Sequence, residues 1–288
     1  MADDFQKRAL LIAGPTASGK SALALKLARQ RGGVIVNADA LQVYRELRIL
    51  TARPTVEAEA EVPHRLYGHV AAQDGYSVAR WLADAKTVLA DAWEQRLLPI
   101  VTGGTGLYFR ALENGLADVP PIDAAVREKW RQFRGDAYGE LKVRDPAAAA
   151  RLNPNDRQRI VRALEVVEST GTPLSHWQAK AQECAIFRNV AIERNFIDVP
   201  RAELYFRAGA RLEQMVANGV LKEVESVLGI DSALPMMKAI GVTEFSAHLR
   251  GDVSLEDAIV LAKTATRQYI KRQLTWWRRQ LPDWKIVQ

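Results

Sequence analysis

GPTASGKS stands at residues 14–21, between an apolar run at residues 9–13 and a stretch of helical periodicity that begins near Ser21. Its members are Gly14, Pro15, Thr16, Ala17, Ser18, Gly19, Lys20 and Ser21. The two glycines let the backbone wrap so that successive N–H groups point at phosphate oxygens. The N-terminus of the following helix adds partial positive charge, Lys20 adds a full charge, and Ser21 stands where such loops place a Mg²⁺ ligand. The segment therefore predicts a site for a phosphate or diphosphate ester.

Two further apolar runs, residues 33–39 and 97–102, predict strands, and residues 78–95 predict an amphipathic helix capped by Ser77. Strands that alternate with helices are typical of a parallel α/β sheet. We therefore expect an α/β fold, a P-loop NTPase-like parallel sheet core flanked by helices. Ligands of such sheets bind beyond the carboxyl ends of the strands. The loops that follow the three strands should converge on one cleft.

The middle of the chain changes character after a proline-rich boundary at residues 116–123. Residues 118–197 show helical periodicity and little strand-like alternation, so we expect an all-α insertion domain there. The catalytic core then comprises residues 1–117 and 198–288. Residues 201–217 predict a helix of this core that ends at Asn218 and Gly219, and residues 255–279 predict another.

Composition narrows the class of protein. The chain has 288 residues, 48% of them hydrophobic, and a net charge of +6, which agrees with a polyanionic partner. One cysteine and four histidines without ligand spacing exclude a disulfide framework and a cysteine-rich zinc site. No run approaches the roughly 18 apolar residues that a membrane helix needs. Because residues 1–8 are charged rather than apolar, we expect a cytoplasmic protein.

Two of the strands end in candidate catalytic residues. The second ends at Asp39, for which three roles are open: a Mg²⁺ ligand, a general base, or a plain turn residue. The third runs into Gly103-Gly-Thr-Gly106, where glycine permits close approach to a ligand and Thr105 offers a hydroxyl. The alternative for this segment is a tight turn with an exposed threonine.

Two basic groupings are candidates for binding phosphates. Arg207 and Arg211 are four residues apart on a helix, and their planar forks suit a pyrophosphate, although arginines on an exposed helix are often merely solvated. In the C-terminal helix, Arg267, Lys271 and Arg278 fall within about 40° of one another. Aromatic residues lie beside this basic stripe, a combination that suits a nucleic acid. The alternative is an amphipathic helix that buries its tryptophans.

Six segments, in this order along nearly the whole chain, resemble those of the bacterial tRNA dimethylallyltransferases, which prenylate the adenine next to the anticodon. They are GPTASGKS at 14–21, NADALQVYR at 37–45, TGGTGLY at 102–108, NPNDRQRIVRALE at 153–165, AIG at 239–241 and RQYIKRQLTW at 267–276. The resemblance implies prenyl transfer from dimethylallyl diphosphate with Mg²⁺, rather than phosphoryl transfer.

The resemblance also implies roles for individual residues. Asp39 would accept a hydrogen bond or proton from the adenine amine, with Thr105 assisting. Lys20, Ser21 and either Arg207 or Arg211 would neutralise the departing diphosphate, with Ser21 as the metal ligand. The residues expected to contact tRNA, from the resemblance and the basic stripe, are Asp39, Ala40, Leu41, Gln42, Thr105, Arg127, Gln158, Arg159, Ile160, Val161, Arg162, Arg267 and Lys271. We expect a monomer.

Three other functions compete with this one. A small-molecule kinase could use ATP in the same loop, but it leaves the basic C-terminal stripe without a role. A prenyltransferase acting on free AMP, ADP or ATP does not need the large insertion. A non-catalytic nucleic-acid-binding module leaves Lys20, Ser21 and Asp39 unexplained. Prenyl transfer to tRNA is therefore favoured.

Overall fold

The computed structural model describes residues 6–181, 185–280 and 283–287 of the chain. The chain divides into two compact units, one formed by Met1–Phe109 with Asn189–Gln288 and the other by Arg110–Arg188. The insertion is expected from the sequence at residues 118–197, whereas the second unit begins at residue 110 and ends at residue 188. The difference at its end has a direct cause, because residues 191–197 form a strand of the sheet rather than part of the helical domain.

A six-stranded sheet in the order β3-β2-β4-β1-β5-β6 forms the centre of the first unit, and neighbouring strands pair in parallel. The strands are β1 (Arg8–Ala13), β2 (Gly33–Asn37), β3 (His64–Arg65), β4 (Leu98–Gly103), β5 (Ala191–Ile197) and β6 (Lys285–Val287). Strands β1, β2 and β4 are buried along almost their whole length, as expected for strands covered on both faces. The predicted α/β fold class is confirmed.

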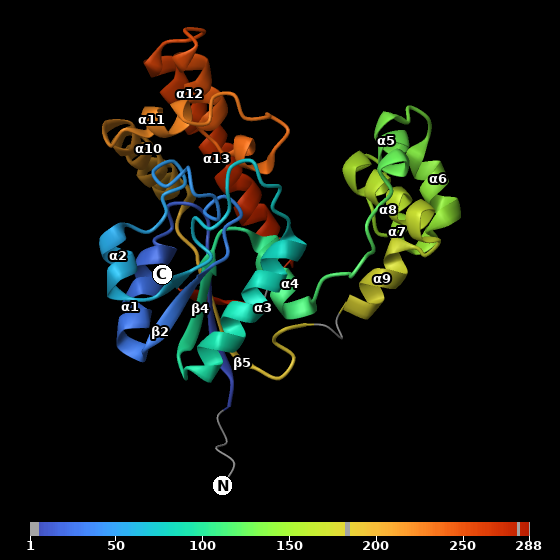
Figure 1. The fold of residues 1–288 in the computed structure, drawn as a ribbon, viewed down its shortest axis with the longest axis horizontal. Helices are drawn as coiled ribbons and strands as arrows, with labels where there is room; N and C mark the ends of the chain where they lie inside the picture. The colour runs from blue at the N-terminus through green and yellow to red at the C-terminus, as the bar shows by residue number, and fades with distance from the viewer. Residues whose placement is uncertain (1–5, 182–184, 281–282, 288) are drawn as a thin grey trace. The chain divides into compact units, whose positions relative to one another are not determined.

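Helices cover both faces of the sheet (Figure 1). The connection from β1 to β2 crosses the sheet in one direction and the connection from β2 to β4 returns in the other. Right-handed crossovers therefore place α1 (Lys20–Arg31) and α3 (Val78–Glu94) on opposite faces. The predicted cap of α3 is confirmed, because Ser77 Oγ accepts a hydrogen bond from the Arg80 N–H at 3.3 Å. Its predicted apolar face is also buried, at Trp81, Ala85, Leu89 and Trp93.

The C-terminal helices gather beyond one end of the sheet (Figure 1). They are α10 (Arg201–Ala217), α11 (Val220–Glu225), α12 (Val242–Leu249) and α13 (Leu255–Gln280). The predicted bounds of α10 are confirmed. Trp277 of α13 is buried among Phe109, Phe196 and Trp284, with ring centroids 5.0–5.4 Å away. No helix in the described part of the chain is both long and apolar enough to cross a membrane.

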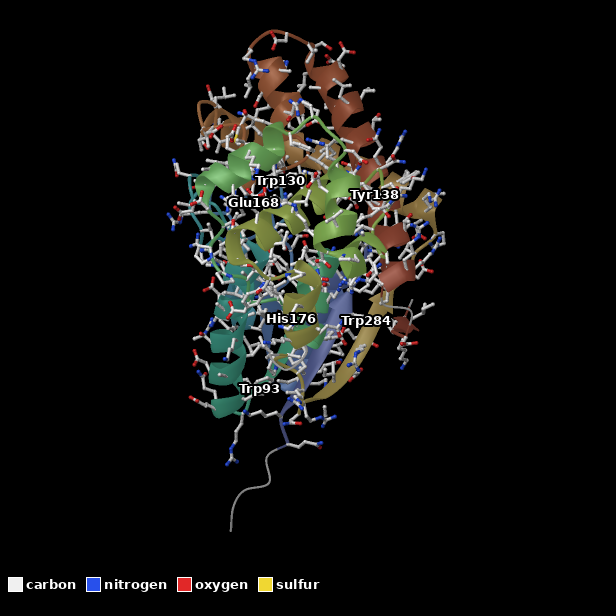
Figure 2. All side chains as sticks on the ribbon, turned by 90° about the vertical axis from the view of Figure 1, so that its right-hand side faces the viewer. Trp93, Trp130, Tyr138, Glu168, His176 and Trp284 are labelled. Carbon is white, nitrogen blue, oxygen red and sulfur yellow. The ribbon has the colours of Figure 1, made fainter. Side chains whose placement is uncertain are left out.

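The remaining short elements complete both units. In the first unit they are α2 (Val56–Glu61), a 3-10 turn at Pro235–Lys238 and the start of α4 (Gly106–Asn114). The second unit contains α5 (Ala124–Gln132), α6 (Ala137–Arg144), α7 (Pro146–Ala149), α8 (Arg157–Thr170) and α9 (Leu174–Lys180), without a strand in its described residues. Its core includes Trp130, whose indole N–H donates to Glu168 Oε2 at 3.0 Å (Figure 2).

Gly103→Ala is predicted to destabilise the sheet edge that carries the site. An added Cβ at residue 103 would lie 2.1 Å from the Ala38 carbonyl oxygen, which is backbone and cannot turn aside. We expect the free energy of unfolding, measured by urea denaturation, to fall by about 1–3 kcal/mol. Gly75→Ala is the matched control, because a Cβ there meets nothing within 4 Å. Equal stability of the two variants would contradict this prediction.

Candidate active site

The phosphate loop, residues 14–21, wraps tightly between β1 and α1. Ala17 and Gly19 have φ values of 65° and 91°, and the Ser18 N–H donates to the Pro15 carbonyl at 3.2 Å. Ser18 Oγ is buried and has no hydrogen-bond partner among the described residues. A Cβ at residue 14 would lie 2.7 Å from this oxygen, so a glycine is favoured at this position. The loop thus combines a tightly curved backbone with a hydroxyl that is available for hydrogen bonding, as is typical of an anion site.

Lys20 lies at the first position of α1, and its Nζ donates to the Pro15 carbonyl at 3.2 Å, across the loop. Burial lowers the pKa of Lys20 to about 8, although the negative charge of Asp39 acts in the opposite direction. The neighbouring positive charge of Arg211 lowers the pKa further. Two cations that share the one carboxylate of Asp39 favour the binding of a multiply charged anion.

Asp39 lies just beyond β2, in a turn that Asn37 holds in place. Asn37 Oδ1 accepts from the Asp39 N–H at 2.8 Å, and Asn37 Nδ2 donates to the Asp39 and Leu66 carbonyls, each at 3.0 Å. Asp39 Oδ1 accepts from the Leu41 N–H at 3.0 Å. The carboxylate is therefore fixed at the carboxyl edge of the sheet.

Thr105 joins this turn from the loop that follows β4. Its Oγ1 accepts from the Ala40 N–H at 2.9 Å, and its own N–H donates to the Ala38 carbonyl at 3.1 Å. Since the Thr105 hydroxyl accepts this bond, its proton is available to a ligand. The predicted convergence of the loops after β1, β2 and β4 is confirmed.

A cavity of about 210 Å³ opens at this point. Its polar lining comes from Thr16, Asp39, Thr51, Arg211, Lys238, Thr266, Tyr269 and Arg272. Its apolar lining comes from Leu41, Leu50, Ala208, Leu212, Met215, Ala239 and Ile240. One cavity thus combines a residue of the phosphate loop, a carboxylate and a hydrocarbon wall. Such a lining suits a ligand with an anionic head and a short apolar chain.

The two arginines of α10 have different surroundings. Arg211 is half-buried, lines the cavity, and donates from Nη2 to Thr16 Oγ1 of the phosphate loop at 2.5 Å. Burial lowers its pKa, and the charge of Asp39 opposes that effect. Arg207 is exposed and forms an ion pair with Glu203, one turn earlier in the same helix. Of the two predicted diphosphate ligands, the structure therefore brings Arg211 to the loop and leaves Arg207 on the surface.

The residues of the helical unit that were predicted to contact tRNA divide by exposure. Arg127, Gln158, Arg159 and Arg162 are exposed. Ile160 is only 1% exposed and packs in the core of the unit, so its side chain does not face a ligand. A depression of about 520 Å³ is lined by Arg131, Arg157, Gln158, Val161, Arg162 and Glu165. The basic face of α8 is thus hollowed rather than flat.

The predicted basic stripe of α13 is exposed at Arg267, Lys271 and Arg278. Its aromatic neighbours serve other purposes, because Trp277 belongs to the buried aromatic cluster and Tyr269 lines the cavity. Trp276 packs against Gly106, where an added Cβ would lie 2.0 Å from its ring. The alternative of an amphipathic helix is therefore confirmed in part, because the segment exposes its cations and buries Trp277. Binding of this segment to nucleic acid stays a prediction.

Sequence reasoning missed Gln273 of α13. Its amide contacts both the phosphate loop and the loop that follows β4, and its side chain is almost fully buried. The sequence does contain a signal, because Gln273 lies on the same face of the helix as the apolar residues Ile270, Leu274 and Trp277. A polar side chain buried on such a face needs hydrogen-bond partners.

The donors near the loop fit a magnesium ion. Ser21 offers a hydroxyl in the first turn of α1, and Asp39 offers a carboxylate. Mg²⁺ prefers such hard oxygen ligands and is commonly held by one or two protein groups together with substrate phosphates. The described residues contain no cluster of three or more His, Cys, Asp or Glu side chains. A bound diphosphate would therefore supply much of the coordination.

The fold and this site define a phosphate-loop α/β enzyme whose loop borders a partly apolar cavity. The family model described as IPP transferase matches residues 42–280, and the one described as isopentenyl transferase matches residues 7–75. The chain belongs to the IPP transferase family. The resemblance seen in its motifs is thereby confirmed.

Relatives and solved structures agree with this assignment. The tRNA dimethylallyltransferase of Azorhizobium caulinodans is 51% identical, over 96% of this chain and 90% of the relative. The tRNA dimethylallyltransferase of Chelativorans is 50% identical, over 97% of this chain and 98% of the relative. The tRNA isopentenylpyrophosphate transferase of Bacillus halodurans has a TM-score of 0.69 at 32% identity, over 98% and 89% of the two chains. A eukaryotic dimethylallyltransferase acting on tRNA has a TM-score of 0.86 at 27% identity, over 98% of this chain and 73% of that one.

The lowered pKa of Lys20 predicts a pH dependence for anion binding. In the free protein Lys20 is protonated below about pH 8 and loses its charge above it. We therefore expect the Kd for inorganic diphosphate, measured by calorimetry, to rise severalfold between pH 7 and pH 9. Lys20→Arg keeps its charge over this range. The same rise in Lys20→Arg would show that another group is responsible.

Proposed function

We propose that the protein transfers a dimethylallyl group from dimethylallyl diphosphate to the exocyclic amine of the adenine 3′ to the anticodon in tRNA. The carrying observation is that Thr16 of the phosphate loop, the Asp39 carboxylate and an apolar wall share one cavity. The relatives named tRNA dimethylallyltransferase support this reaction over phosphoryl transfer. We infer a cytoplasmic enzyme that acts as a monomer.

The phosphate loop binds the leaving group in this reaction. The bond between the first prenyl carbon and the diphosphate oxygen breaks, and its electron pair leaves with the diphosphate. Lys20 and Arg211, whose positive charge lowers the pKa of Lys20, stabilise the charge that develops there. The Ser21 hydroxyl would hold Mg²⁺ beside the loop, and the ion would supply further positive charge to the diphosphate. The apolar wall holds the five-carbon chain.

Asp39 and Thr105 act on the acceptor. The adenine nitrogen forms a bond to the prenyl carbon and must lose a proton. Asp39 Oδ1 already accepts from the Leu41 N–H, so Oδ2 is the oxygen that takes the hydrogen bond or proton of the amine. The Thr105 hydroxyl, which accepts from the Ala40 N–H, orients the base by donation. The adenine leaves its stack to reach this site, which costs least in a single-stranded loop.

The tRNA backbone binds to two basic surfaces. One is the face of α8 with Gln158, Arg159 and Arg162, to which Arg127 of α5 adds a further exposed cation. The other is the stripe of α13 with Arg267 and Lys271. Exposed cations that neutralise phosphates give sequence-independent affinity and strong salt dependence. Selection of the target adenine is then left to the cavity.

A single transfer assay separates the competing functions. Purified protein is incubated with Mg²⁺, radiolabelled dimethylallyl diphosphate and unmodified tRNA, with AMP and ATP as parallel acceptors. Label in tRNA alone supports the proposal, whereas label in the free nucleotide assigns the protein to nucleotide prenylation. No transfer, with ATP consumed on a small acceptor, would make it a kinase.

Asp39→Asn and Asp39→Ala are predicted to lower kcat by about 10²–10⁴-fold, because the amine loses its proton acceptor. The Kd for tRNA, measured by filter binding, should change less than about threefold, since backbone contacts supply most of the affinity. Asp91→Asn on the exposed surface of α3 is the control and should match wild type. A large loss of tRNA affinity with unchanged kcat would sink the role given to Asp39.

Arg159→Glu with Arg162→Glu is predicted to weaken tRNA binding and to flatten its salt dependence. Removing about two phosphate contacts should lower the slope of log K against log salt by nearly two. Lys26→Glu with Lys86→Glu makes the same change in net charge at exposed positions of α1 and α3. If both double variants weaken binding equally, the effect is one of net charge and not of this surface.

A further inference from the structure

Gln273 joins two loops of the active site that are far apart in sequence. Its Oε1 accepts from the Thr16 N–H of the phosphate loop at 3.0 Å. Its Nε2 donates to the Gly104 carbonyl, in the loop that carries Thr105, at 3.0 Å. The side chain is 6% exposed and comes from α13, one turn beyond Tyr269 of the cavity lining.

The absence of a side chain at Gly104 makes room for this amide. A Cβ at residue 104 would lie 2.5 Å from Gln273 Nε2, 3.4 Å from Asp39 Oδ2 and 3.6 Å from the Gly14 carbonyl oxygen. The loops after β1, β2 and β4 therefore meet at this point. Gln273 is the side chain that bonds the first of them to the third.

We propose that Gln273 is a positioning residue, which fixes the distance between the diphosphate site and the acceptor site. This inference rests on the proposed prenyl transfer, in which the leaving group is held by one loop and the amine by the residues beside the other. A transfer of this kind requires reacting atoms about 3–3.5 Å apart, so a small shift between the loops costs rate.

A primary amide is suited to the task. It accepts and donates at once, and it adds no charge beside a diphosphate. A carboxylate at this position would keep the acceptor for Thr16 but would repel both the Gly104 carbonyl and the bound anion. A lysine would have no acceptor for the Thr16 N–H.

The kinetic test compares Gln273→Met with Gln30→Met, an exposed residue at the far end of α1. We expect kcat of Gln273→Met to fall roughly 10–100-fold, with the KM for dimethylallyl diphosphate within threefold of wild type. Gln273→Glu should lower kcat and also raise this KM, because it places negative charge beside the diphosphate. If both Gln273 variants melt at a lower temperature but retain wild-type kcat per folded site, Gln273 is only a structural residue.

A double-mutant cycle tests whether Gly104 acts through the same contact. Gly104→Ala should lower kcat in the wild-type background, because its new Cβ displaces the amide. The same substitution should cost several times less in a Gln273→Ala background, where that space is empty. Independent, multiplicative losses would overturn the proposed link between the two residues.

Hydrogen exchange with inorganic diphosphate tests the link without any transfer. In wild type, diphosphate should slow exchange both in residues 14–21 and in residues 103–109, because the second segment is bonded to the first through Gln273. Gln273→Met should keep the first effect and lose the second. Equal protection of both segments in the variant overturns the inference. Absence of prenyl transfer by wild type, by contrast, overturns the proposed function, and the exchange comparison still decides the role of Gln273.

Discussion

The parallel register of β1, β2 and β4 is the constraint on which the rest of the site depends. Adjacent parallel strands end at the same edge, so three loops separated by up to about ninety residues of sequence open at one place. Each loop brings one kind of group there: backbone N–H donors with Lys20, the carboxylate of Asp39, and the hydroxyl of Thr105. The helices α10 and α13 then complete the cavity with Arg211, Tyr269 and an apolar wall.

The electrostatic balance of this site supports the proposed diphosphate leaving group. Burial lowers the pKa of both Lys20 and Arg211, and the negative charge of Asp39 offsets only part of that effect. In the proposed reaction, a bound diphosphate would restore the balance, and the two cations would stabilise the negative charge that grows on it during bond cleavage. The same loop that holds ATP in a kinase can thus support the breaking of a carbon–oxygen bond.

Local sequence signals predicted much of this molecule, and long-range contacts account for what they missed. The phosphate loop, the Ser77 cap and the bounds of α10 depend on neighbouring residues and could be predicted. The start of β5 could not, because its first residues are only partly buried and its pairing partner β1 is about 180 residues earlier. Arg207 and Arg211 have the same spacing pattern, and only tertiary packing separates them. Gln273 forms hydrogen bonds with two loops that are distant in sequence, and no local pattern in α13 indicates those contacts.

The central claim is that the phosphate loop receives diphosphate as a leaving group after cleavage between carbon and oxygen. Dimethylallyl diphosphate labelled with ¹⁸O at the bridging oxygen tests this directly, with mass spectrometry of the products of one turnover on tRNA. The claim predicts that the released diphosphate carries the ¹⁸O and that the prenyl group is on the adenine nitrogen. Recovery of the label in dimethylallyl alcohol, with unlabelled diphosphate or phosphate, would show cleavage between phosphorus and oxygen and would contradict it.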